Sequence, residues 1–396
     1  MEKINLIKKQ RSWMEISLSN YQYNIYSIQK LLPRGCKILQ VVKADAYGHG
    51  AVEIAKKAVS LGINFFGVAN VMEGIQLRKN KIYNPILVLS PNFNYEIPDI
   101  LEYNLIPTIS TMEFAKKLSD SVKNNKIAVH INIDTGFGRS GFYLDKKNKL
   151  KNTIEQIYKL PNLSVEGIFS HFAASDDDVK FTKIQTERFK SFLNTLSFVP
   201  EYIHISNGCG IFSSDLEGFN LVRVGLISYG APIAFQKEIK LKPVMSFKTK
   251  IIQIKGAEIG DSIGYNRTYI AKKRIKYAIL PIGYADGYNF FLSGKGVVLI
   301  NGSICNIIGR VSMDMIAVDI TPIQAQCGDT VTLVGWENKN IFPQEVANLF
   351  GGSVYEILCN AGKRSTKFFF EHQKLLSVYA HQRRDKLPNI YYNVNV

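Results

Sequence analysis

The chain has 396 residues, more than one ordinary hydrophobic core holds and enough for two domains. It is 46% hydrophobic and 21% charged, a globular composition that excludes a disordered chain. No apolar run reaches membrane-spanning length, so we expect no membrane partner, while the net charge of +16 raises the question of an anionic partner.

The first 230 residues alternate between strand and helix patterns. Runs rich in β-branched and aromatic residues predict strands at 36–43, 64–69, 85–90, 106–110, 127–134, 163–172, 201–206 and 220–229. Amphipathic helices are predicted at 50–61, 71–79, 111–124 and 180–196. Eight strands with helices between them predict an α/β fold, a (β/α)8 TIM barrel, whose chemistry lies at the C-terminal ends of the strands.

The pattern changes near residue 240. From there to about residue 370, short β-rich runs are punctuated by Gly, Asn and Asp, and only 343–350 has a helical pattern. The runs at 247–254, 277–281, 296–300, 315–320 and 330–334 predict a mostly antiparallel β C-terminal domain. We expect a barrel over residues 12–240, a β domain over 241–380 with residues 1–11 packed on it, and a basic tail over 381–396.

Lys43 is the most informative single residue. It ends a short apolar run that is typical of a buried strand, and Tyr47, Gly48 and Gly50 follow it. An amine at the end of such a strand is poorly solvated, which lowers its pKa and leaves more of the free base that attacks an aldehyde. A lone lysine at a strand end is more often a surface residue. The residues around Lys43 must therefore show whether it is a nucleophile.

That string, Lys-Ala-Asp-Ala-Tyr-Gly-His-Gly at 43–50, resembles the segment that binds pyridoxal phosphate (PLP) in the alanine racemase family. Further strings resemble the family in the same order along the chain, at 134–141, 204–207, 223–230, 264–269, 281–287 and 309–314. The resemblance spans roughly residues 12–370. It implies a PLP-dependent amino-acid racemase.

The resemblance assigns a role to each matching residue. Lys43 and Tyr265 would be the two catalytic bases, with Tyr265 supplied by a partner subunit, so a homodimer with shared active sites is implied. Arg139 and the backbone of Met313 would bind the substrate carboxylate. The cofactor would be held by Lys43, Tyr47, His171, Asn207, Gly208, Arg223, Gly225, Leu226 and Lys363. The entryway would be lined by Asp176, Tyr284 and Phe290.

Two bases fit the chemistry of racemisation. PLP delocalises the charge left when the α-proton of an amino acid departs, and inversion then needs one base on each face of the planar centre. In the family, the residue matched by Arg223 faces the pyridine nitrogen of the cofactor. Because an arginine keeps its proton, that nitrogen stays unprotonated and the ring is a weak electron sink, which argues against a decarboxylase.

Four positions near the expected site depart from the family pattern. Asn132 replaces a carbamylated lysine whose negative charge steadies the arginine, so we expect an anion such as chloride, or a nearby acid, beside Arg139. Gly208 replaces a phosphate-binding serine. Phe290 and Lys363 stand where the family has a gate arginine and a gate tyrosine. Lys363 could contact phosphate through its charge, and loss of the tyrosine ring predicts room for serine or larger substrates.

The leading interpretation is an alanine racemase that supplies D-alanine for peptidoglycan in the cytoplasm, since no signal-peptide pattern is present. A broad-specificity or serine racemase of the same fold is an alternative. A non-catalytic PLP-carrier protein is another, although such carriers lack the second domain. Scattered basic residues without a motif argue against nucleic acid, and five scattered cysteines argue against disulfides or a metal site.

Overall fold

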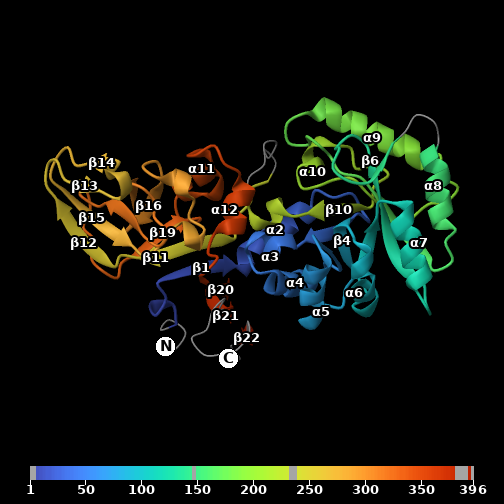
Figure 1. Ribbon diagram of the computed structural model, residues 1–396, viewed down its shortest axis with the longest axis horizontal. Helices are drawn as coiled ribbons and strands as arrows, with labels where there is room; N and C mark the ends of the chain where they lie inside the picture. The colour runs from blue at the N-terminus through green and yellow to red at the C-terminus, as the bar shows by residue number, and fades with distance from the viewer. Residues whose placement is uncertain (1–5, 145–148, 232–238, 380–390, 394–396) are drawn as a thin grey trace.

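The computed structural model describes residues 6–144, 149–231, 239–379 and 391–393. Two bodies lie side by side along the longest axis of the molecule, a barrel ringed by helices and a β-rich body (Figure 1). The predicted combination of a barrel followed by a β domain is therefore confirmed.

The barrel is built from parallel strands in the order β10-β2-β3-β4-β5-β6-β8-β9. Its strands are β2 (Lys37–Val41), β3 (Phe65–Val68), β4 (Ile86–Pro91), β5 (Ile106–Ile109), β6 (Ile127–Asp134), β8 (Leu163–Phe169), β9 (Tyr202–His204) and β10 (Leu221–Val224). Between β9 and β10, Asn220 N donates to Ile203 O and Arg223 N donates to Ser206 O, which nearly closes the barrel. All eight predicted strands are present, and the last ends early because residues 226–229 form the 3-10 helix η2 (Leu226–Tyr229).

Helices surround the barrel as their hydrophobic faces require. They are α2 (Leu18–Gln29), α4 (Ala51–Ser60), α5 (Val71–Lys79), α6 (Ile97–Glu102), α7 (Met112–Ser121), α8 (Lys149–Tyr158), α9 (Val179–Leu193) and the short α10 (Gly210–Ser213). The start of each predicted helix is set by its cap where one is present. The side chains of Asn70, Thr111 and Asp178 accept hydrogen bonds from the third residue of α5, α7 and α9.

The second body contains an eleven-stranded sheet in the order β12-β15-β18-β17-β16-β19-β11-β1-β20-β21-β22. Its strands are β1 (Ser12–Ser17), β11 (Met245–Lys250), β12 (Gln253–Ala257), β15 (Ile275–Leu280), β16 (Val297–Ile300), β17 (Ser303–Ile308), β18 (Ile316–Asp319), β19 (Thr330–Val334), β20 (Thr366–Glu371), β21 (Lys374–Tyr379) and β22 (Tyr391–Asn393). A separate hairpin joins β13 (Ser262–Ile263) to β14 (Tyr269–Ile270), and β7 (Phe142–Tyr143) pairs with β6 in the barrel body. Two helices, α11 (Pro343–Asn348) and α12 (Val354–Asn360), complete the second body.

The assignment of residues 12–17 to the barrel needs a correction. β1 pairs with β11 and β20 of the second sheet, and its Met14 and Ile16 are fully buried there. Its alternating apolar pattern identifies a strand but carries no information about which sheet it joins. Arg11 O, just before β1, accepts a hydrogen bond from Thr249 Oγ1, so this part of the N-terminal segment also contacts the second body. The predicted tail lies outside the described residues except for β22.

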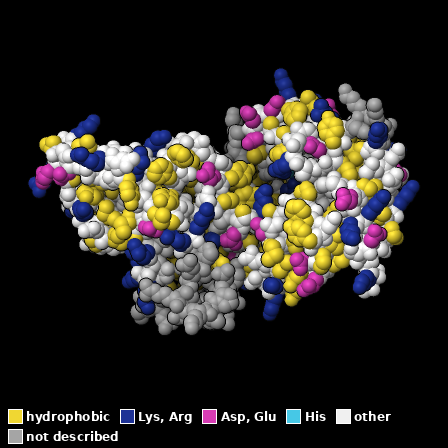
Figure 2. Space-filling model, viewed as in Figure 1, with side chains coloured by type: hydrophobic (Ala, Val, Ile, Leu, Met, Phe, Trp, Pro, Cys, Tyr) yellow, Lys and Arg dark blue, Asp and Glu magenta, His cyan; other side chains and the backbone are white. Residues whose placement is uncertain are grey.

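On the face drawn in Figure 2, basic side chains are scattered among acidic and hydrophobic ones. Among the described helices, none is long and apolar enough to cross a membrane.

Candidate active site at the C-terminal end of the barrel

The residues predicted for the site converge at the C-terminal end of the barrel. Lys43 follows β2, Arg139 follows β6 and His171 follows β8. Asn207 follows β9, and Arg223 lies within β10. Two adjoining cavities of about 320 and 230 Å³ share Lys43, Arg139, His171 and Arg223 in their walls. Residues far apart in sequence thus meet where barrel enzymes carry out their chemistry.

Lys43 opens a turn with an uncommon backbone. In α3 (Lys43–Tyr47), the last four residues have φ values of 52–54°, in the left-handed region. A non-glycine residue there costs about 1–2 kcal/mol, and such strain gathers at functional sites. Burial, then the charge of Arg139, lowers the pKa of Lys43, against the opposing carboxylate of Glu73. More of Lys43 is therefore the free amine than in a solvated lysine.

Arg223 is a buried hub. It is 4% exposed, and its guanidinium donates to the carbonyls of Ser170, His204 and Ile205 and to the rings of His171 and His204. Burial is the main cause that lowers its pKa to about 9, so the guanidinium keeps its proton at neutral pH. A buried cation surrounded by acceptors fixes the direction of every hydrogen bond around it.

The histidine tautomers follow from this direction. Arg223 donates to Nδ1 of His171 at 2.8 Å and to Nδ1 of His204 at 2.7 Å, so both rings carry their proton on Nε2. His204 Nε2 then donates to Nδ1 of His130 at 3.0 Å. Burial, then the charge of Arg223, lowers the pKa of all three rings, to about 3 for His130. His171, His204 and His130 are therefore neutral rings. The first two accept hydrogen bonds from Arg223, and the third accepts one from His204.

The smaller cavity has the features of an anion cradle. Its walls include Tyr47, Gly208, Gly225 and Leu226. A Cβ at Gly225 would lie 2.8 Å from Tyr47 Oη, so only glycine lets this phenol approach the backbone. A Cβ at Gly208 would lie 3.1 Å from Ile227. Four of the residues predicted to hold the cofactor therefore lie together.

Asn207 and Tyr355 complete the smaller cavity. Asn207 Oδ1 accepts from Gly210 N at 2.8 Å and so fixes the loop after β9. Tyr355, on α12, places its ring centroid 5.9 Å from that of Tyr47. Burial raises the pKa of Tyr355 to about 12, and the charge of Asp176 adds to this effect. The sequence pattern assigns no role to Tyr355, although it begins a string that aligns with the family.

Arg139 borders both cavities without an acidic partner. No ion pair joins it to a carboxylate within the part of the chain that is described. Its guanidinium lies over the Phe137 ring, 4.2 Å from the centroid. Asn132 is 5% exposed, and its amide donates to the carbonyl and the hydroxyl of Ser140, both at 3.1 Å. Asn132 therefore supports the turn that carries Arg139 but supplies no charge to it.

The second predicted base lies elsewhere in the chain. Tyr265 belongs to the 3-10 helix η3 (Tyr265–Arg267), which connects β13 and β14, and it is 68% exposed. Figure 1 places these two strands at the end of the β body farthest from the barrel. Tyr265 lines neither cavity that contains Lys43. One chain therefore does not bring the two predicted bases together.

The predicted entrance residues of the second body form one group. Tyr284, Phe290 and Lys363 line a cavity of about 220 Å³. Tyr284 N donates to Ser312 O at 3.1 Å, which ties its loop to the loop of Met313. Lys363 does not line the cradle that contains Tyr47, so its predicted phosphate contact stays a prediction.

Arg364, next to Lys363, fastens these loops. Its guanidinium donates to both carboxylate oxygens of Asp286 at 2.8 Å and to Asp314 at 2.7 Å. Asp286 is 5% exposed, so this bidentate pair is shielded from solvent on one side. The three strings at 281–287, 309–314 and 363–364 are thus held as one unit.

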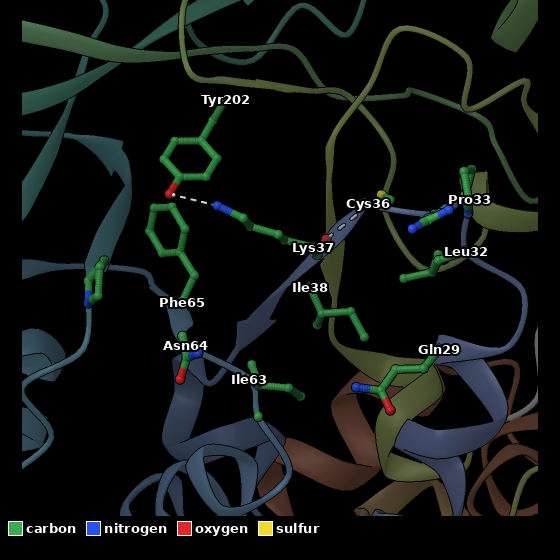
Figure 3. A pocket seen from close by; sticks show the side chains of 14 residues that line it. Gln29, Leu32, Pro33, Cys36, Lys37, Ile38, Ile63, Asn64, Phe65 and Tyr202 are labelled. Carbon is green, nitrogen blue, oxygen red and sulfur yellow. Dashed lines mark hydrogen bonds between the residues drawn. The ribbon is translucent and has the colours of Figure 1, made fainter.

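A larger cavity, of about 650 Å³, lies at the opposite end of the barrel (Figure 3). Lys37 crosses it, and its Nζ approaches Tyr202 Oη at 3.4 Å. Lys37 starts β2, whereas Lys43 follows the end of the same strand. Its walls include Leu32, Ile38 and Phe65. The charge partner of Lys37 is Glu201, in an exposed ion pair with Nζ and Oε1 3.8 Å apart. Size alone does not make this cavity the catalytic one.

The comparisons agree with this geometry. The family described as the alanine racemase N-terminal domain matches residues 16–232, and the alanine racemase C-terminal domain matches residues 244–369. The chain is similar to the alanine racemase of Geobacter sulfurreducens, with 36% identity over 90% of this chain and 96% of that one. Its structure is similar to alanine racemase from Clostridium difficile 630, with a TM-score of 0.89, 33% identity and coverage of 94% and 99%. It is also similar to Bartonella henselae alanine racemase with covalently bound pyridoxal phosphate, with a TM-score of 0.83, 27% identity and coverage of 91% and 100%. The chain belongs to the alanine racemase family.

Proposed function

We propose that the protein is a PLP-dependent racemase that interconverts L-alanine and D-alanine. The observation that supports this most strongly is the position of Lys43. It stands between an anion cradle and a cluster of Arg139, His171 and Arg223, at the end of the barrel where such enzymes work. An amine with a lowered pKa in a cationic cavity is suited to an anionic aldehyde and a carboxylate substrate.

The residues present fit PLP. The cradle offers the backbone N–H groups of Gly208 and Leu226 and the phenol of Tyr47, a set of donors that suits a phosphate. Arg223 faces the cavity as a fixed donor, so it would meet an unprotonated pyridine nitrogen. PLP, when bound, supplies the electron sink that lets the α-proton of an amino acid leave.

The two bases have distinct tasks. Lys43, once free, takes or returns the proton on one face of the substrate carbon. Tyr265 of a partner subunit does the same on the other face. A phenol has an ordinary pKa near ~10 and needs help at neutral pH. Because Nδ1 of His171 accepts from Arg223, the ring carries its proton on Nε2, on the side away from Arg223. This Nε2–H would donate to the Tyr265 phenolate and stabilise it.

We infer a head-to-tail homodimer from the placement of Tyr265. This phenol is exposed and lies on the remote hairpin of the β body, so a second chain has to deliver it to the barrel. Met313, 53% exposed in the linked loop, would arrive with it and offer its backbone to the substrate carboxylate. D-alanine made in this way would serve peptidoglycan synthesis in the cytoplasm.

The test uses purified protein with added PLP. L-alanine, L-serine, L-lysine and L-arginine are incubated separately and each D-enantiomer is measured. D-alanine formation that is lost in both Lys43→Ala and Tyr265→Phe supports the proposal. Several D-products would move the assignment to a broad-specificity racemase. A cofactor absorbance band that Lys43→Ala abolishes, without any D-product, would indicate a PLP carrier.

A further inference from the structure

The left-handed turn that carries Lys43 is contacted by the second body of the same chain as well as by the barrel. The turn belongs to the barrel, yet two elements of the β body, α12 and β20, touch it or its flanks. Four successive left-handed residues other than glycine do not persist on their own propensity, since each costs about 1–2 kcal/mol. The contacts that impose this backbone therefore decide where Lys43 points.

The first contact is an ion pair. Asp45, in the middle of the turn, accepts from Lys367 Nζ of β20, with Oδ2 and Nζ 2.6 Å apart. The Lys367 side chain is 10% exposed, so solvent screens the pair only partly. The other carboxylate oxygen of Asp45 accepts from Ala51 N at 2.8 Å and caps α4. One carboxylate thus joins the lysine turn, the next barrel helix and the second body.

The second contact is steric. A Cβ at Gly48, which ends the turn, would lie 2.2 Å from the carbonyl oxygen of Leu358 on α12. A Cβ at Gly50 would lie 2.6 Å from the ring of Phe369 on β20. The second body therefore packs directly against the turn at two positions that carry no side chain of their own. Tyr355, also on α12, adds the ring contact to Tyr47 described above.

Contacts from the barrel itself also hold the turn. Glu73 accepts from Ala44 N at 2.8 Å, and the ring of His49 lies at hydrogen-bond distance from the carbonyls of Ala46 and Tyr47. These bonds orient single peptide groups. The barrel also holds the Asp45 carboxylate through Ala51 N, and the Lys367 pair is the bond that joins the same carboxylate to the second body.

We propose that the β body acts within its own chain as a clamp on the lysine turn, with Asp45 and Lys367 as positioning residues for Lys43. Packing of the β body on the barrel and binding of PLP then favour each other, because each stabilises the left-handed backbone of residues 44–47. This inference rests on the assignment of Lys43 as the PLP lysine but not on racemase activity.

The chain offers a matched control. Lys57 of α4 pairs with Glu371 of β20 across the same boundary between the bodies. The lysine side chains of the two pairs are similarly shielded, at 12% exposed for Lys57 and 10% for Lys367. The Lys57 pair does not touch the turn. Lys57→Met and Lys367→Met therefore remove equivalent bonds between the bodies, and only the second releases the turn.

The measurement is PLP affinity of full-length protein, from the absorbance of the lysine-bound cofactor. We expect Lys367→Met and Asp45→Asn each to weaken PLP binding roughly tenfold, and the double variant to be little worse than either, because both remove one pair. Lys57→Met should stay within about twofold. Equal affinities for Lys367→Met and Lys57→Met would overturn the clamp.

A second measurement does not require cofactor. Hydrogen–deuterium exchange of residues 44–50 in PLP-free protein should speed up in Lys367→Met and remain slow in Lys57→Met. Asp45→Asn retains an oxygen that can accept from Ala51 N at the start of α4. This variant replaces Lys367→Met in the measurement if Lys367→Met fails to fold. Unchanged exchange in both Lys367→Met and Asp45→Asn would contradict the clamp. Normal PLP binding without any D-amino acid would instead fault the proposed function and leave the clamp standing.

Discussion

Arg223 and His171 are joined by a hydrogen bond of 2.8 Å from Nη2 to Nδ1, which leaves the His171 proton on Nε2, facing away from Arg223. The same guanidinium also fixes His204, whose Nε2–H reaches His130. A single buried cation therefore sets the proton positions of three rings across the barrel. The proposed activation of Tyr265 depends on that arrangement.

Arg223→Lys tests this dependence. An ammonium keeps the positive charge but is a compact donor that cannot span both imidazoles and three carbonyls. We expect kcat for L-alanine to fall by about 10²-fold, the scale of losing a preorganised donor, while PLP absorbance is retained. Steady-state kinetics on PLP-saturated enzyme check this expectation. A wild-type kcat would show that the fixed tautomer is irrelevant.

Acid lability is expected from the buried histidines. Burial lowers the pKa of His49 to about 4 and of His130 to about 3 in the folded protein, against 6.5 for an ordinary histidine. Below pH 6.5 these histidines become protonated in the unfolded chain but stay neutral in the folded one. The free energy of unfolding is therefore highest above pH 6.5 and falls as the pH drops towards the pKa values of the folded state. Each ring should cost up to about 2 kcal/mol at pH 5.

Urea unfolding at pH 7.5, 6 and 5, at one protein concentration, measures this effect. His130→Gln retains an acceptor for His204 but no longer titrates, so it should flatten the dependence of stability on pH by up to one proton. An unchanged slope in this variant would mean that His130 is not the buried, neutral ring that the structure describes.

Arg139 should respond to small anions. It has no acidic partner among the described residues, and the Asn132 amide is committed to Ser140. A chloride ion beside Arg139 would steady its guanidinium for the substrate carboxylate, so chloride should lower the KM for L-alanine roughly threefold or more relative to gluconate at equal ionic strength. Asn132→Lys, assayed with bicarbonate so that the lysine becomes carbamylated as in the family, should abolish the difference. Identical KM values in both salts for the wild type would refute the idea.

Substrate breadth should follow the entrance residues. Phe290 and Lys363 line one cavity with Tyr284, and neither matches the family gate. We expect Phe290→Arg combined with Lys363→Tyr to shift the ratio of kcat/KM for L-alanine over L-serine about tenfold towards alanine, a usual scale for discrimination by pocket size. Kinetics with the two substrates give this ratio. A wild-type enzyme that already excludes serine would remove the case for breadth.

Much of the architecture is visible in the sequence because local and global signals agree there. Each barrel strand is a β-rich run of suitable length, and several helices begin at a capping residue. β1 was misplaced because the alternation in Ser12–Ser17 marks a buried face without naming the neighbouring strand. Which sheet a strand joins depends on contacts distant in sequence, here with residues around 247 and 368.

The site was predictable where it follows motifs and unpredictable where it depends on tertiary contact. Lys43, His171 and Arg223 meet as expected at the strand ends. The left-handed turn was not foreseen, since alanine and aspartate favour right-handed backbone. Lys367 gave no signal either, because its partner lies 322 residues away.

The central claim is that each active site combines Lys43 of one chain with Tyr265 of another. Lys43→Ala and Tyr265→Phe are each expected to be nearly inactive alone. When the two variants are co-expressed and assemble at random into dimers, about a quarter of the sites should contain both intact residues, so D-alanine formation should recover to about a quarter of the wild-type rate. No recovery in mixed dimers, with PLP bound to the Tyr265→Phe chain, would contradict a site shared between subunits.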